Sequence, residues 1–129
     1  MTRGAGIYKC GVVDFENILS VLHTSPVNNL ATLLSCLLKN ENSCFALIIE
    51  LENVCIGIVD QVRSMPIYFG AKRDIQLSNS SRDLLSGKSS TEFSRSGVDE
   101  FLLSGYVHGS NTLVDGISQL QGGQFIIID

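Results

Sequence analysis

Residues 45–59 contain the pattern that most restricts the fold, because apolar side chains alternate along two short segments joined by a turn. One face is shared by Phe45, Leu47, Ile49 and Leu51, and after Glu52-Asn53 another is shared by Val54, Ile56 and Ile58. This period of two predicts an antiparallel β-hairpin. The intervening positions are mostly apolar too, so we expect both faces of the hairpin to be covered.

A second apolar pattern predicts a helix before the hairpin. The leucines at positions 30, 33, 34, 37 and 38 have helical spacing, Asn28 or Asn29 can cap the start, and Lys39 suits the negative end of the helix dipole. Upstream, we expect a short strand at 7–13 and a helix from Asp14 that Ser25-Pro26 ends.

The remaining elements are short. Strands are expected at 66–70 and 75–78, a helical turn at 82–85, a helix from Val98 that ends near Gly105, and a last strand after Gly122-Gly123. Residues 86–97, which are rich in serine, are predicted to form an exposed loop.

Composition excludes several classes of protein. A hydrophobic fraction of 44% and a mean hydropathy of +0.24 supply a core, and 129 residues fit one domain over 1–129. Nine basic against 13 acidic residues give a net charge of −4, which disfavours nucleic-acid binding. The longest apolar run, 44–49, is far shorter than a membrane span, and the first residues lack an export signal. We expect a cytoplasmic protein without nucleic-acid or membrane partners.

The sequence shows no motif for a metal or cofactor. The cysteines (Cys10, Cys36, Cys44 and Cys55) lack Cys-x-x-Cys spacing, and the two histidines lie far apart. We therefore expect no cofactor and no metal, and four reduced thiols, most of them packed as small apolar side chains.

Four short motifs resemble catalytic ones without completing them. Gly87-Lys88-Ser89 ends like a phosphate-binding loop, but Arg82 stands where that loop needs a glycine. His108-Gly109-Ser110 places a base near a hydroxyl without a third group, and predicts a solvated loop. Two carboxylate pairs, Asp14/Glu16 and Asp99/Glu100, are interpreted as residues at helix starts.

Three longer blocks occur in order along the second half of the chain. They are the Phe45 hairpin with Asp60-Gln61-Val62-Arg63-Ser64-Met65-Pro66-Ile67-Tyr68-Phe69-Gly70, then the segment 77–85, and then residues 101–125. In order and spacing they resemble the segments with Asp-Arg and Pro-Leu-Tyr-Tyr-Gly, FASEIKALL, and YLAFGYVPGPRTLFEGIRKLPPGHYL. These segments belong to the class II glutamine amidotransferase domain of asparagine synthetases, and the resemblance covers 45–129.

The resemblance implies an α+β fold, a shortened Ntn-hydrolase-like sandwich of antiparallel sheets flanked by helices. Structural roles are expected for the residues that match the family motifs, namely Asp60, Arg63, Pro66, Tyr68, Gly105, Tyr106, Gly109, Thr112, Leu113, Gly116 and Gly123. We expect Asp60 and Arg63 to pair across a turn, and the four glycines to adopt positive φ. Tyr68, Phe101 and Tyr106 are interpreted as core or interface aromatics.

The departures from the family concern its chemistry. Its nucleophile is an N-terminal cysteine whose own amino group acts as the base, whereas here Thr2 follows Met1 and Cys10 is only a weak candidate. The family's glutamine-clamping segments have no counterpart. Arg63 replaces a glycine of the motif, Met65 a basic residue and Ser80 a glutamate. No catalytic residue is therefore assigned.

The first hypothesis for function is a non-catalytic, amidotransferase-like accessory or scaffold domain of an asparagine-synthetase-type enzyme. A shortened fold leaves apolar surface open, so the expected partner is a second copy or a synthetase (ATP-pyrophosphatase) domain. The alternative is an active glutaminase domain that uses Cys10 or another chain's cysteine to supply ammonia to an ATP-dependent, amide-forming partner. A third is a binding protein on a borrowed fold.

Overall fold

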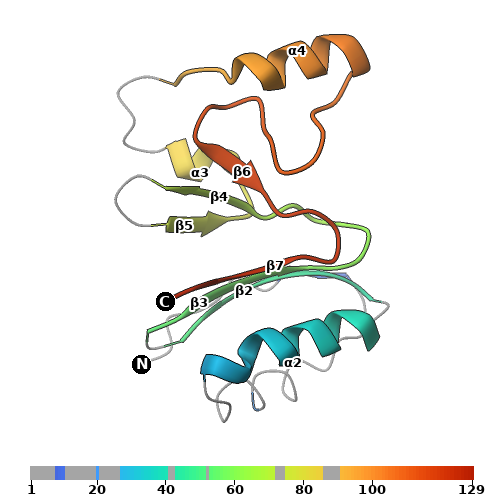
Figure 1. Ribbon diagram of the computed structural model, residues 1–129, viewed down its shortest axis with the longest axis vertical. Helices are drawn as coiled ribbons and strands as arrows, with labels where there is room; N and C mark the ends of the chain where they lie inside the picture. The colour runs from blue at the N-terminus through green and yellow to red at the C-terminus, as the bar shows by residue number, and fades with distance from the viewer. Residues whose placement is uncertain are drawn as a thin grey trace. The chain divides into compact units, whose positions relative to one another are not determined.

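The computed structural model describes residues 8–10, 20, 27–40, 43–51, 53–71, 75–85 and 91–129 (Figure 1). The chain divides into two compact units, Met1–Met65 with Gly122–Asp129, and Pro66–Gln121. Each described unit combines helix with antiparallel sheet, so the α+β prediction is confirmed at that level.

The first unit is built on a four-stranded antiparallel sheet. Its strands are β1 (Tyr8–Cys10), β2 (Cys44–Glu50), β3 (Cys55–Val59) and β7 (Phe125–Ile128), in the order β1-β2-β3-β7. The predicted hairpin is β2–β3, in which Leu47 lies opposite Ile58 and Ile49 opposite Ile56. Both strands are buried over most of their length, as their continuous apolar sequence predicts.

The core of this unit lies between the sheet and helix α2 (Val27–Asn40), which runs along one face of the sheet in Figure 1. Leu30, Leu34 and Leu38 of α2 recur every fourth residue and are all buried. They pack against alternate residues of the hairpin, namely Phe45, Leu47, Ile49, Ile56 and Ile58. Every fourth residue along the helix and every second residue along the strands therefore contribute side chains to one apolar layer.

The second unit contains a three-stranded antiparallel sheet of order β5-β4-β6. Its strands are β4 (Tyr68–Ala71), β5 (Ile75–Ser78) and β6 (Ile117–Gln119), and its helices are α3 (Ser81–Leu85) and α4 (Arg95–Ser104). The long connection from β5 to β6 carries both helices, and brings β6 back beside β4.

Most predicted elements are present, with shifted ends. Strand β4 begins at Tyr68 because Pro66 has no N–H for strand pairing, and β6 is a strand that the sequence did not predict. The helix predicted after Asp14 lies outside the described residues except for Ser20, which is helical. No helix in the described part of the chain is both long and apolar enough to cross a membrane.

The predicted loop at 86–97 needs correction at its end. Residues 86–90 lie outside the described residues, but Phe93 bridges Val114, and α4 already begins at Arg95. The helix starts early because Ser94 caps it, its side chain accepting a hydrogen bond from the N–H of Gly97 at 3.2 Å. Gly97 is consequently buried rather than exposed.

Candidate functional site

The motif residues of the first unit gather around the carboxylate of Asp60, which follows β3 and is only 1% exposed. Its Oδ2 accepts the N–H of Phe45 at 2.9 Å, and its Oδ1 accepts that of Val62 at 2.8 Å. The N–H of Ser64 lies 3.1 Å and 3.3 Å from the two oxygens. The carboxylate thus joins the start of β2 to the turn after β3, and every partner named here is a backbone group.

The protonation state of Asp60 follows from these contacts. Burial by itself raises the pKa of the Asp60 carboxyl, but hydrogen bonds from Ser64, Val62 and Phe45 outweigh it and hold the pKa below its usual range. The group is therefore a buried anion held by the side chain of Ser64 and by backbone N–H groups. Such a carboxylate shapes a turn and is a poor proton acceptor.

The predicted pairing of Asp60 with Arg63 is wrong as an ion pair, since no ion pair joins these two described residues. Instead, the N–H of Arg63 donates to the backbone oxygen of Asp60 at 3.1 Å. Arg63 has a φ of 52°, and no other non-glycine residue in the described part of the chain has a positive φ. The two residues do shape one turn, but through the backbone.

Gly122 and Gly123 close the same turn from the end of the chain that leads into β7. The N–H of Gly123 donates to the backbone oxygen of Asp60 at 2.8 Å, and Gly123 has a φ of 71°. A Cβ at Gly122 would overlap the backbone oxygen of Gln61. The predicted turn at Gly122-Gly123 is confirmed, and Gly122 is required by a close backbone approach.

The motif residues of the second unit lie on α4 and the loop that follows it. A Cβ at Gly97 would overlap the backbone oxygen of Thr112, so α4 touches the loop backbone directly. The Thr112 hydroxyl lies 2.7 Å from the backbone oxygen of Ile117 and accepts the N–H of Val114 at 3.1 Å. Thr112 therefore fixes the loop on which α4 rests.

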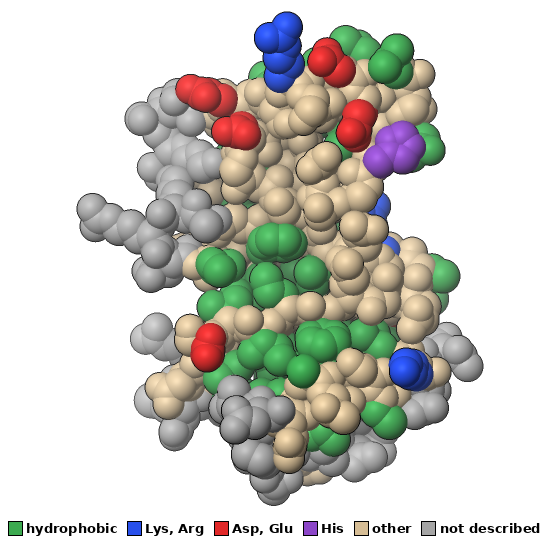
Figure 2. All heavy atoms as spheres, viewed as in Figure 1, with side chains coloured by type: hydrophobic (Ala, Val, Ile, Leu, Met, Phe, Trp, Pro, Cys, Tyr) green, Lys and Arg blue, Asp and Glu red, His purple; other side chains and the backbone are tan. Residues whose placement is uncertain are grey.

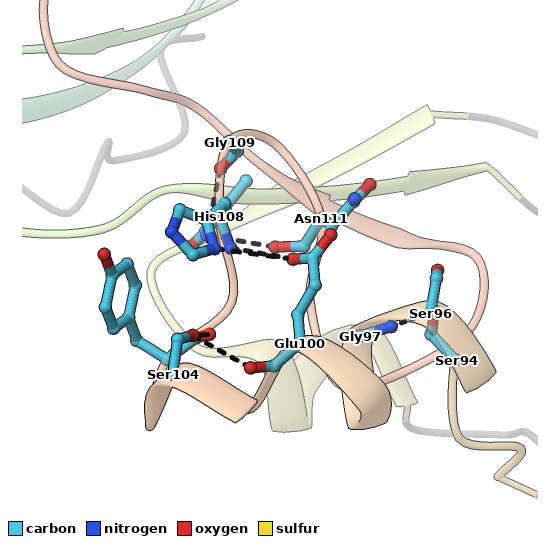
Figure 3. Close-up of polar contacts among 10 residues, drawn as sticks. Ser94, Ser96, Gly97, Glu100, Ser104, His108, Gly109 and Asn111 are labelled. Carbon is cyan, nitrogen blue, oxygen red and sulfur yellow. Dashed lines mark hydrogen bonds and ion pairs between the residues drawn. The ribbon is translucent and has the colours of Figure 1, made fainter. Parts of the chain in front are cut away.

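From the middle of α4, the side chain of Glu100 reaches the loop at His108 (Figure 3). Its Oε2 accepts the backbone N–H of His108 at 3.0 Å and lies 3.9 Å from Nδ1 of the same residue. The Tyr106 ring lies 4.3 Å from the His108 ring, tilted by 44°. Because Glu100 lies beyond the first turn of α4, the interpretation of Asp99/Glu100 as helix-start carboxylates is wrong.

Gln119 is a structural residue of this loop that the sequence did not reveal. Its side chain is nearly buried, and its Nε2 donates to the backbone oxygens of Gly109 and Asn111 at 3.2 Å and 3.0 Å. The backbone N–H of Gln119 donates to the backbone oxygen of Ser110 at 2.9 Å. His108-Gly109-Ser110 is therefore an exposed loop, as predicted, and hydrogen bonds from Gln119 to its backbone fix its position.

The remaining motif residues have local roles. Gly105, Gly109 and Gly116 have φ values of 81°, 62° and 70°, which confirms the prediction for glycine turns. The backbone oxygen of Leu113 accepts the N–H of Ser94 at 2.9 Å. Pro66 and Tyr68 are half-buried at the entry to β4, where Tyr68 lies opposite Ser78 and Gln119.

The cysteines do not form a catalytic group in the described part of the chain. Cys10 is the last residue of β1, opposite Cys44 in the ladder, and its side chain lies outside the described atoms. Cys36, Cys44 and Cys55 are not in disulfides, and Cys36 and Cys44 are exposed, so packing as small core residues is wrong for those two. Burial, together with the charge of Glu50, raises the pKa of the Cys55 thiol and disfavours its reactive thiolate.

Neither a metal site nor a phosphate site emerges from the described residues. They contain no group of three or more His, Cys, Asp or Glu side chains placed to hold an ion. Gly87-Lys88-Ser89 and Asp14/Glu16 lie outside these residues, as does His23.

A cluster of exposed apolar side chains marks the C-terminal end of α4. We call it the α4 terminal surface and define it by Phe101, Leu102, Leu103 and Tyr106. Figure 2 shows apolar side chains at this end of the helix, and the Tyr106 ring lies beside the ring of His108. Phe101 and Tyr106 are exposed. A place in the core, one of the two environments predicted for them, is therefore wrong for both, and a place in an interface stays a prediction. An apolar surface with few polar anchors suits binding to another protein better than chemistry on a small molecule.

Comparisons of the chain with protein-family models, with curated proteins and with solved structures find no match.

Proposed function

We propose that this chain is a non-catalytic, amidotransferase-like domain that works by docking to an asparagine-synthetase-type partner domain. Its fold is a shortened Ntn-hydrolase-like sandwich, and its place of action is the cytoplasm. The proposal combines the motif resemblance of residues 45–129 with the lack of a complete catalytic group among the described residues.

The observation that carries the proposal concerns positive φ angles. In the described part of the chain they occur at Arg63, Gly105, Gly109, Gly116 and Gly123. Each of these five positions aligns with a glycine of the amidotransferase motifs, including position 63, where this chain has arginine. Positive φ is unfavourable for residues with a side chain, so a family that shares these turns retains glycine there. The agreement supports a backbone geometry that this chain shares with the amidotransferase motifs, in addition to shared residue types.

Two features favour a non-catalytic domain. The nitrogen of Cys10 is a backbone amide within β1, and an amide cannot serve as the base that an N-terminal nucleophile needs. Asp60, the most buried of the described carboxylates in the matched region, is engaged by backbone N–H groups and has its pKa lowered. What the motifs retain is therefore the framework of the fold, in the form of turns and close backbone contacts.

Titration of the chain with L-glutamine, followed by the amide NMR spectrum, tests this proposal. We expect no saturable shift at millimolar glutamine, because no clamp for an amino acid is assembled in the described residues. L-aspartate is the matched control for ionic effects. Saturable shifts with glutamine alone, centred on β1 and on the neighbouring Cys44, would contradict a non-catalytic domain.

A further inference from the structure

The α4 terminal surface is large for an unpartnered apolar area. Leu102 and Leu103 are 75% and 89% exposed, and Phe101 and Tyr106 are 45% and 58% exposed. With the usual areas of these side chains, the surface exposes about 400 Å² of apolar atoms, within the range of the largest patches on monomers, which are often functional. A standard interface buries about 800 Å² on each partner, and a little over half of that area is apolar. The exposed apolar area of the α4 terminal surface is therefore about as large as the apolar area on one side of such an interface.

Two negative features lie beside this surface. Asp99 precedes Leu102 and Leu103 by three and four residues, and therefore lies beside both on the outer side of α4. The C-terminal end of the helix adds the negative end of its dipole.

The surface is also fixed in position before any partner arrives. Ser94 caps the start of α4, and Gly97 rests on the backbone oxygen of Thr112. Farther along the helix, the carboxylate of Glu100 accepts a hydrogen bond from the backbone N–H of His108. The helix ends at Gly105, whose N–H donates to the backbone oxygen of Phe101 at 2.8 Å. A fixed apolar surface loses little conformational entropy on binding, which favours affinity.

We propose that the α4 terminal surface binds an amphipathic segment of a partner protein whose leucine-type side chains are flanked by lysine or arginine. The inference rests on the proposed docking function and specifies the chemistry of the partner. Apolar side chains of the segment cover Leu102 and Leu103, while its cations face Asp99 and the end of the helix. This charge pattern mainly increases the association rate and the specificity.

A second copy of the chain suits this surface less well. A two-fold contact would place the surface against itself, so Asp99 and the negative helix end of one copy would approach those of the other. Like charges placed together across an interface are unfavourable. Charge complementarity therefore selects a basic partner over self-association.

The test uses a fluorescent helical peptide of leucine and lysine, and the same peptide with glutamate in place of lysine. By fluorescence anisotropy we expect micromolar binding of the lysine peptide, and at least tenfold weaker binding of the glutamate peptide. The double variant Leu102→Ser/Leu103→Ser should bind the lysine peptide at least tenfold more weakly. Both side chains are exposed, so the variant should keep the fold, which circular dichroism verifies. Val62→Ser, which changes an exposed side chain in the other unit, is the matched control and should bind like the native chain.

Asp99→Lys separates the charge effect from the apolar one, and should weaken the lysine peptide while strengthening the glutamate peptide. Equal binding of the lysine peptide to the native chain and to the double leucine variant would overturn the inference, as would no binding at all. A dimer in sedimentation velocity that the leucine substitutions abolish would also overturn it, in favour of a second copy. None of these results depends on glutamine, so the proposed non-catalytic function is tested separately.

Discussion

The backbone oxygen of Thr112 occupies the space that a Cβ at Gly97 would need, which ties α4 to the loop after it. Gly97 is inside the helix, where alanine would ordinarily be more stable by about 1 kcal/mol. We predict the opposite sign here. Gly97→Ala should lower the free energy of unfolding by about 1–3 kcal/mol, because the clash is with backbone that cannot turn aside.

The matched control for this prediction is Ser96→Ala, which changes an exposed side chain on the same helix and should change stability by less than about 1 kcal/mol. Urea denaturation of the three proteins provides the comparison. A Gly97→Ala variant as stable as the native chain would mean that α4 does not rest on Thr112.

Asp60 should contribute stability that depends on pH in a defined direction. Its pKa in the folded chain lies below the usual value of about 3.9, so its contribution is complete above that value and is lost as the pH falls through the folded pKa. Asp60→Asn, which places an amide among backbone N–H donors, should cost about 2–3 kcal/mol near neutral pH. The deficit should shrink below about pH 4.

Chemical denaturation of the native and Asp60→Asn chains at several pH values measures this difference. Asp99→Asn, which removes an exposed carboxylate, gives the baseline for the loss of one charge. A deficit that stays constant from neutral pH to well below pH 4 would show that the charge of Asp60 does not stabilise the fold.

Arg63 has an unfavourable backbone conformation for a residue with a side chain, since its φ is 52°. Arg63→Gly should raise the free energy of unfolding by about 0.5–1 kcal/mol, because relief of the left-handed conformation exceeds the added flexibility of the unfolded chain. Arg63→Ala keeps the backbone penalty and should give no such gain. If alanine stabilised the chain as much as glycine, loss of the guanidinium would be the cause instead.

The strongest periodic patterns in the sequence predicted the largest elements. The β2–β3 hairpin and helix α2 follow from alternation at Phe45–Ile58 and from leucine spacing at Leu30–Leu38, because each pattern extends over several residues. Strand β6 was missed because Ile117–Gln119 is too short and too mixed to show a period. The start of α4 was missed because its cap, Ser94, is one of many serines in a segment that reads as a loop.

The site was predictable at its turns and less so at its side-chain contacts. Glycine at positions 105, 109, 116 and 123 predicted positive φ correctly, since few other residues adopt it readily. Asp60 and Arg63 were expected to pair across a turn, but they do so through the backbone, and backbone N–H groups from two segments reach the carboxylate of Asp60. Contacts such as Glu100 with His108, or Gln119 with Gly109, depend on how the chain returns and leave no local pattern.

The most direct test of the central claim is ammonia release from L-glutamine by the purified chain, measured beside its Cys10→Ala variant. We predict no release above background for either protein, because neither a base for Cys10 nor a clamp for glutamine is assembled in the described residues. Turnover well above background in the native chain that Cys10→Ala abolishes would contradict a non-catalytic domain and establish an active glutaminase.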